Sequence, residues 1–110
     1  MGPFGEDIEN PDSRAIPAAF HGEWVRDVSD CGNPASRSRE VIEAERLIIG
    51  NSVERVVAVR FITPLQIAVV TRTGDGGEDY SLHYRGVSED GNRLVDLENT
   101  DWVLSRCPAG

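Results

Sequence analysis

The stretch IPAAFHGEWVR, residues 16–26, decides the fold of this 110-residue chain. It reads as a first β-strand, preceded by a proline, and it carries Gly-x-Trp at Gly22–Trp24. From Phe20 to Val28, Trp24 and Val28 fall on one face and the acidic residues Glu23 and Asp27 on the other, a period of two that predicts a half-buried strand over residues 20–28. We expect it to pair with the last strand, residues 101–107, so that the two ends of the chain meet and the sheet closes.

Turn-forming stretches divide the rest of the chain into strands, about eight to twelve residues apart. The turns at residues 74–77 (GDGG) and 88–92 (SEDGN) are rich in residues that tolerate positive φ. Residues 39–49 fit two readings, a helix forming a plug or lid, or a hairpin that turns at residues 44–45. We favour the hairpin because the later segments are all β. The sequence therefore predicts an all-β fold, a small antiparallel up-and-down meander barrel of about eight short strands.

The chain is long enough for one domain with a single core. Residues 1–15 are acidic and nearly devoid of apolar side chains, so we expect a flexible N-terminal tail. Residues 16–110 then form the single barrel domain. The tail does not resemble a signal peptide, and we expect that an export signal precedes this sequence and is removed.

Cys31 and Cys107 are the only two cysteines, and each follows one of the strands that we expect to meet. This placement predicts a disulfide that closes the barrel and stabilises it by roughly 4 to 5 kcal/mol through loop-closure entropy. A disulfide favours an oxidising compartment, the periplasm or the exterior of the cell. The alternative is a cytosolic protein with two unrelated buried thiols.

The formal net charge of −8 argues against nucleic acid and anionic membrane surfaces as partners, because both attract clustered positive charge. No run of eighteen apolar residues is present, so no transmembrane helix is expected. We expect a monomer.

Gly22–Trp24 on the first strand and Arg106 on the last resemble the structural signature of the calycins, the lipocalin-like small up-and-down barrels. The resemblance implies that Trp24 packs under the side chain of Arg106 and that Gly22, Trp24 and Arg106 are structural. The chain also resembles uncharacterised exported bacterial proteins with Ile-Pro, Gly-x-Trp, an early cysteine and a terminal Arg-Cys. It is much shorter than the larger lipocalins, so any internal cavity should be small.

Catalytic and metal-binding patterns are weak in this sequence. His21 and His83 lack metal-ligand spacing and are interpreted as ordinary strand-surface residues. The acids of residues 75–79 (Asp75, Glu78 and Asp79) lack the spacing of a calcium loop, and Glu43 and Glu45 suit a solvated strand face. We therefore expect no metal, no cofactor and no catalytic residues.

Four large aromatic side chains, Trp24, Tyr80, Tyr84 and Trp102, carry polar groups that suit a barrel mouth or a partner surface. Most are needed for the core, and ligand or partner contact is the weaker interpretation. We expect a non-catalytic binding or interaction module for a small apolar ligand or a protein. One alternative is an inhibitor of a secreted protease or lysozyme, acting through the loop at residues 29–38. The other is an enzyme that uses carboxylates and histidine at the barrel mouth.

Overall fold

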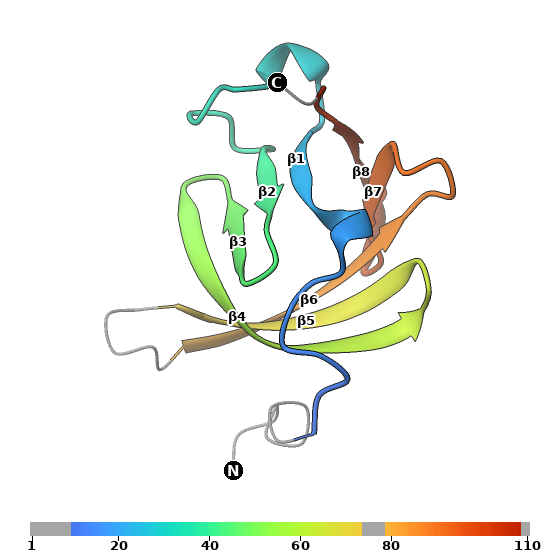
Figure 1. Ribbon diagram of the computed structural model, residues 1–110. Coiled ribbons are helices and arrows are strands. Elements are labelled where there is room, and N and C mark those ends of the chain that lie inside the picture. The colour runs from blue at the N-terminus through green and yellow to red at the C-terminus, as the bar shows by residue number, and fades with distance from the viewer. Residues whose placement is uncertain (1–9, 74–78, 109–110) are drawn as a thin grey trace.

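The computed structural model describes residues 10–73 and 79–108, and in these residues the chain forms a closed antiparallel barrel (Figure 1). Each strand pairs with the next, and the first pairs with the last. The strands are β1 (Gly22–Val25), β2 (Glu40–Ile42), β3 (Arg46–Ile49), β4 (Ser52–Thr63), β5 (Gln66–Thr73), β6 (Asp79–Val87), β7 (Arg93–Asp96) and β8 (Asn99–Arg106). The predicted eight-stranded meander barrel is confirmed.

Residues 39–49, for which the sequence allowed a helix or a hairpin, form the hairpin. β2 and β3 pair from Glu40↔Ile49 to Ile42↔Leu47, and the N–H of Glu43 closes the turn on the carbonyl of Arg46 at 2.9 Å. The helical plug or lid is therefore wrong. Buried Ile42 and Leu47 lie opposite each other on the inner face, which is the packing that a pleated pair supplies.

The barrel closes where β1 meets β8, with Trp24 opposite Arg106 and Val25 opposite Ser105. The N–H of Cys107 continues the pairing by donating to the carbonyl of Glu23 at 2.8 Å. Cys31 and Cys107 form the expected disulfide, with their Cα atoms 5.7 Å apart. Both predictions about the ends of the barrel are confirmed.

β1 is shorter than the strand expected over residues 20–28. A single 3-10 turn, η1 (Ala18–Phe20), precedes it, and a second, η2 (Val28–Asp30), follows it. The carboxylate of Asp27 accepts from the N–H of Ser29 at 3.0 Å and so caps η2. Val28 is consequently 62% exposed rather than on the face of Trp24, and that part of the prediction is wrong.

The described part of the expected N-terminal tail, residues 10–15, lies along β4 beyond the end of β3. Ser13 exchanges two backbone hydrogen bonds with Val59, at 3.0 and 2.8 Å. The Asp12 carboxylate accepts from the N–H of Phe61 at 2.9 Å, and Arg14 donates to the carbonyl of Val57 at 3.0 Å. These contacts satisfy edge groups of β4 that β3 does not reach, so this part is held rather than loose. Residues 1–9 of the tail lie outside the described residues.

The apolar core fills one end of the barrel. Trp24 and Phe20 are both fully buried there, and the indole Nε1–H of Trp24 donates to the carbonyl of Phe20 at 3.0 Å. The core cluster consists of Ile16, Phe20, Trp24, Ile42, Leu47, Val56, Val59, Ile67, Val69, Val87, Leu94 and Leu104. No helix in the described residues is long and apolar enough to cross a membrane. The predicted turn at residues 74–77, which contains Asp75, lies outside the described residues, and so does Glu78.

Candidate functional site

Polar side chains occupy the part of the barrel interior that the apolar core does not fill. On β6, the partners of Ser81, His83 and Arg85 are the buried β5 residues Thr71, Val69 and Ile67, so this alternate set points inward. Charged residues from three other strands, β2, β4 and β7, and a threonine from β5 face the same space. The polar interior consists of Glu40, Glu54, Thr71, His83, Arg85 and Asp96.

A buried ion pair crosses the interior from β6 to β2, two strands that are not neighbours in the sheet. Arg85 donates through Nε and Nη2 to the two carboxylate oxygens of Glu40, both at 3.0 Å, and its Nη1 lies 3.7 Å from Asp96. The side chains of Arg85 and Glu40 are only 10% and 4% exposed. Burial pulls the pKa of Arg85 down, but the hydrogen bonds and charge of Glu40 outweigh it, so the pKa is raised and the guanidinium stays charged.

A second polar group joins β4, β5 and β6. One carboxylate oxygen of Glu54 accepts from Thr71 Oγ1 at 2.6 Å and from His83 Nε2 at 2.8 Å. Because the hydroxyl and the imidazole both bond to Glu54, they do not form a nucleophile–base chain. Among the described residues, the ring of His83 makes this hydrogen bond alone, through Nε2.

A pocket of about 340 Å³, which we call the mouth, opens above these groups. Trp102 forms an aromatic wall, with the guanidinium of Arg26 stacked 4.7 Å from the centre of the indole ring. The mouth is lined by Arg37, Ser38, Arg39, Glu40, Ile49, His83, Arg85, Asp96, Asn99 and Trp102. An adjacent hollow of about 450 Å³ lies between residues 34–37 and residues 49–51, and Arg37 is its only charged lining residue among those the structure describes.

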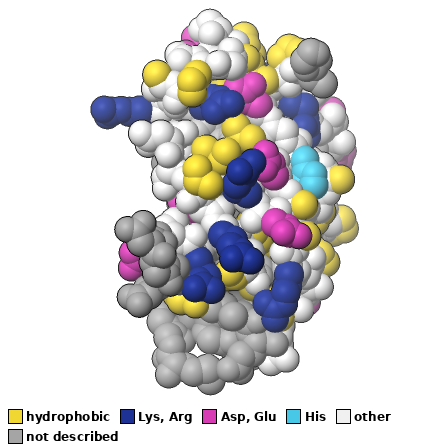
Figure 2. Space-filling model, turned by 60° about the vertical axis from the view of Figure 1, so that its left-hand side comes forward, with side chains coloured by type: hydrophobic (Ala, Val, Ile, Leu, Met, Phe, Trp, Pro, Cys, Tyr) yellow, Lys and Arg dark blue, Asp and Glu magenta, His cyan; other side chains and the backbone are white. Residues whose placement is uncertain are grey.

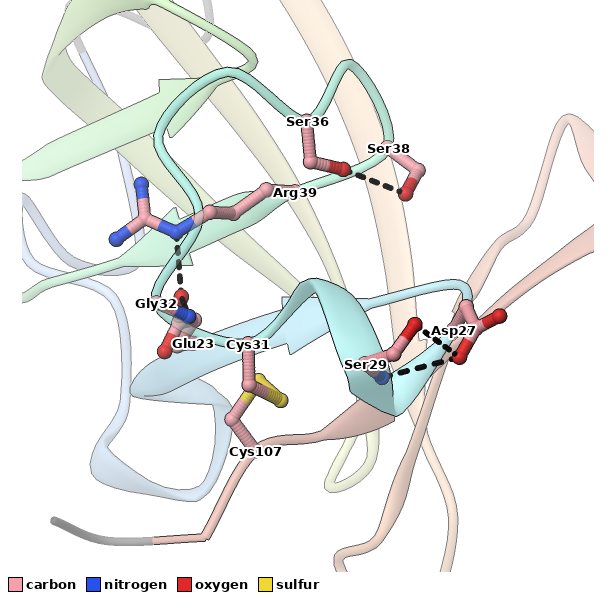
Figure 3. Close-up of a disulfide and its surroundings, with 9 residues drawn as sticks. All are labelled: Glu23, Asp27, Ser29, Cys31, Gly32, Ser36, Ser38, Arg39 and Cys107. Atoms are coloured by element: carbon pink, nitrogen blue, oxygen red, sulfur yellow. Dashed lines mark hydrogen bonds and ion pairs between the residues drawn. A yellow bond between two sulfur atoms is a disulfide. The ribbon is translucent and has the colours of Figure 1, made fainter.

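The loop between β1 and β2 is fixed from several sides (Figure 3). The disulfide of Cys31 ties it to the end of β8, and the Glu23 carboxylate accepts from the N–H of Gly32 at 2.7 Å and from Arg39. The hydrogen bond from Arg39 holds the pKa of Glu23 below its ordinary value. Residues 32–35 remain exposed at the tip, so the loop presents a constrained surface.

The end of the barrel opposite the mouth is closed by Arg106 and Trp24, the pair singled out in the sequence. The guanidinium carbon of Arg106 lies 4.1 Å from the centre of the Trp24 ring. Gly22 has φ of +133°, and a Cβ there would lie 2.8 Å from Nη1 of Arg106. The glycine of Gly-x-Trp therefore makes room for the arginine, which explains the spacing of the motif.

The four aromatic residues considered as contact residues are not brought together. Trp24 is buried in the core and Trp102 lines the mouth. Tyr80 and Tyr84 lie on the outer face of β6, because Ser81, His83 and Arg85 occupy its inner positions. Tyr80 is 42% exposed, and neither tyrosine is among the residues that line the mouth.

His83 is the clearest difference from the sequence interpretation, since it faces the interior rather than the surface of its strand. His21 donates to the carbonyl of Ile16 at 2.6 Å and so fastens the chain before β1. Asp79 and Glu45 are exposed, and Glu43 pairs with Arg46 on the outside.

Sequence reasoning missed Glu40, Glu54, Arg85 and Asp96 as members of a common site. The available signal was the alternation on β6, where Ser81, His83 and Arg85 share a face. Either face of that strand could be the inner one, and only the pairing with β5 decides it. Comparison with protein-family models, curated proteins and solved structures finds no match to this chain.

Proposed function

We propose that this protein is a non-catalytic binding module whose ligand occupies the mouth. The observation that supports this is a pocket of about 340 Å³ with a floor of buried, hydrogen-bonded charges. A buried ion pair such as Arg85–Glu40 contributes little net stability compared with apolar residues of similar volume. A stable core alone does not require it, and at the floor of a pocket it offers charged groups to a polar ligand.

The ligand class follows from the lining of the mouth. The sequence predicts a small apolar ligand or a protein partner, whereas guanidinium, carboxylate, hydroxyl, amide and imidazole groups surround this pocket. Trp102 and Ile49 supply the apolar surface. The ligand is accordingly a small molecule with a flat apolar ring and with both hydrogen-bond donors and acceptors. The volume of the mouth lies within the usual range of ligand pockets.

The test uses the indole N–H signals of the two tryptophans, one in the mouth and one in the core. Nicotinamide, tyramine and 4-hydroxybenzoate serve as neutral, cationic and anionic rings, and laurate as an apolar chain. We expect at least one ring compound to shift the Trp102 signal saturably and the Trp24 signal little. Asn99→Ala should weaken that binding, while Val103→Ala, an exposed change on the same strand, should not. Binding of laurate alone would contradict the polar ligand, and no shift by any ring would contradict the mouth as a site.

A second candidate, inhibition of a secreted hydrolase, is favoured by the constrained loop of Figure 3. An exposed tip held by a disulfide and by Glu23 loses little conformational freedom on binding. Inhibition of a lysozyme or a trypsin-like protease, measured before and after reduction of the disulfide, tests it. Inhibition that survives reduction unchanged would argue against this role for the loop.

We further propose that the protein acts as a monomer outside the cytosol, in the periplasm or beyond the cell. The disulfide supports an oxidising compartment. The geometry around Thr71 and His83 supports the absence of nucleophilic catalysis, because Glu54 lies between them. A screen of ester, peptide and glycoside substrates should show no activity that Glu54→Gln abolishes.

A further inference from the structure

Arginine side chains gather on one outer face of the barrel (Figure 2). Arg55 on β4 lies directly opposite Arg46 on β3 and directly opposite Arg72 on β5. The neighbours of these residues along each strand point inward, so the three guanidinium groups form an outward row. Like charges in direct register destabilise a sheet, and this protein has a formal net charge of −8.

Two members of the row, Arg55 and Arg72, line a hollow, whereas Arg46 pairs with Glu43 outside it. A pocket of about 340 Å³ contains Arg55 and Arg72, and the N-terminal segment adds Arg14 to the same space. Arg14 is positioned by its hydrogen bond to the carbonyl of Val57. Glu45 is the only acidic lining residue that the structure describes, so three guanidinium groups face one carboxylate. We call Arg14, Arg55 and Arg72 the arginine patch.

The three members of the patch differ in their contacts with the rest of the protein. The Arg72 guanidinium lies 5.7 Å from the centre of the Tyr80 ring, and Arg14 and Arg72 take part in further interactions as well. Arg55 is exposed and makes no hydrogen bond or ion pair with the described part of the chain. The density of positive charge, rather than any unpaired side chain, is what attracts an anion here.

We infer that the arginine patch binds a compact oxyanion, phosphate or sulfate, either free or as the ester group of a small molecule. The planar guanidinium group matches such oxyanions with two parallel hydrogen bonds. A long polyanion is disfavoured because the protein as a whole repels it. The patch is separate from the mouth, so the protein has two sites of different chemistry.

The experiment titrates isotope-labelled protein at low ionic strength in a phosphate-free buffer, first with inorganic phosphate and then with phenyl phosphate. The arginine Nε–H signals report binding. We expect a saturable shift of the Arg55 signal in the wild type. Arg55→Gln should raise the dissociation constant about tenfold, the loss expected for one hydrogen bond between charged groups. Arg93→Gln removes the same charge from an exposed position on β7 and should change the constant by less than about twofold, because distant surface charges are screened.

Tighter binding of phenyl phosphate than of inorganic phosphate identifies an ester as the ligand, and equal binding identifies the free ion. Both results support the site. Absence of a saturable shift in the wild type overturns the inference. Equal weakening by Arg55→Gln and Arg93→Gln also overturns it, because the effect would then be one of net charge. Both variants change exposed side chains, and a thermal melt checks that each is folded.

Discussion

Arg106 reaches across the closed end of the barrel and stacks on Trp24, with 4.1 Å between the guanidinium carbon and the centre of the ring. Its Nε donates to the carbonyl of Gly91 at 2.8 Å, and its Nη groups donate to the carbonyls of His21 and Ala19. One side chain thus joins β8, the turn between β6 and β7, and the segment before β1. Loss of the ring beneath it should affect all three.

Trp24→Ala should lower the free energy of unfolding by about 3 to 5 kcal/mol, because a fully buried indole leaves a cavity. Urea denaturation measures the change. Trp102→Ala is the matched control, since Trp102 is only half-buried at the mouth and should cost much less. A nearly neutral Trp24→Ala would show that the ring does not anchor the closed end.

Gly22→Ala should be more damaging than Gly32→Ala. Both glycines have positive φ, and alanine at such a position costs more than about 1 kcal/mol. Only the Cβ at Gly22 meets Arg106, at 2.8 Å, whereas no atom lies within 4 Å of a Cβ at Gly32. Gly22 has φ of +133° and Gly32 has φ of +78°, nearer the left-handed helical region, so Gly22→Ala adds the clash to a larger backbone cost. Equal losses in melting temperature would contradict both contributions.

Arg85→Met should destabilise the protein by about 3 to 5 kcal/mol, because it leaves the buried Glu40 carboxylate without its partner. The double variant Glu40→Leu/Arg85→Met should recover most of that loss. A double-mutant cycle by chemical denaturation measures the coupling. If the double variant is no more stable than Arg85→Met, the single loss does not come from the orphaned carboxylate.

Replacement of Cys31 and Cys107 by serine should lower the stability by roughly 4 to 5 kcal/mol, because the disulfide links residues 76 apart in sequence. Denaturation of both forms tests the magnitude. Alkylation before and after reduction, with peptide mapping, checks the link itself. Free labelling of both thiols in unreduced protein would contradict the bridge.

The loop between β1 and β2 should loosen in acid. The hydrogen bond from Arg39 lowers the pKa of Glu23 below its ordinary value of 4.5. Its stabilising contribution is therefore complete above pH 4.5 and is lost as the pH falls through the lower folded value. Hydrogen exchange of the Gly32 amide should rise over that range. Glu23→Gln should remove this pH dependence, while Asp90→Asn, in a different turn, should leave it unchanged.

The sequence was sufficient for the architecture because its strongest signals are local. Turn residues such as those at 88–92 separate the strands, and the two cysteines link the first strand to the last. It was less informative where a side chain changes the local path. The Asp27 cap starts η2 and shortens β1, and a bulge after Val56 places Val56 and Val59 inside in place of a strict alternation.

The site was harder to predict because β6 offers two chemically plausible faces. Tyr80 and Tyr84 look like inner residues by size, and Arg85 looks like a surface residue by charge. The barrel reverses this choice, since Glu40 supplies a partner for Arg85 from β2, about 45 residues earlier in the chain. Such a partner is invisible until the strands are assembled, and the same holds for His83 with Glu54.

The position of Asp12, Ser13 and Arg14 along the edge of β4 has a practical consequence for anyone who prepares shortened or tagged forms of this protein. A form that starts at Ile16, where the barrel domain was first placed, leaves four backbone groups of β4 without these hydrogen-bond partners. The bare edge then invites pairing between molecules. Preparations that begin before Asp12 keep that edge covered, and a fusion partner is better attached ahead of this segment than in its place.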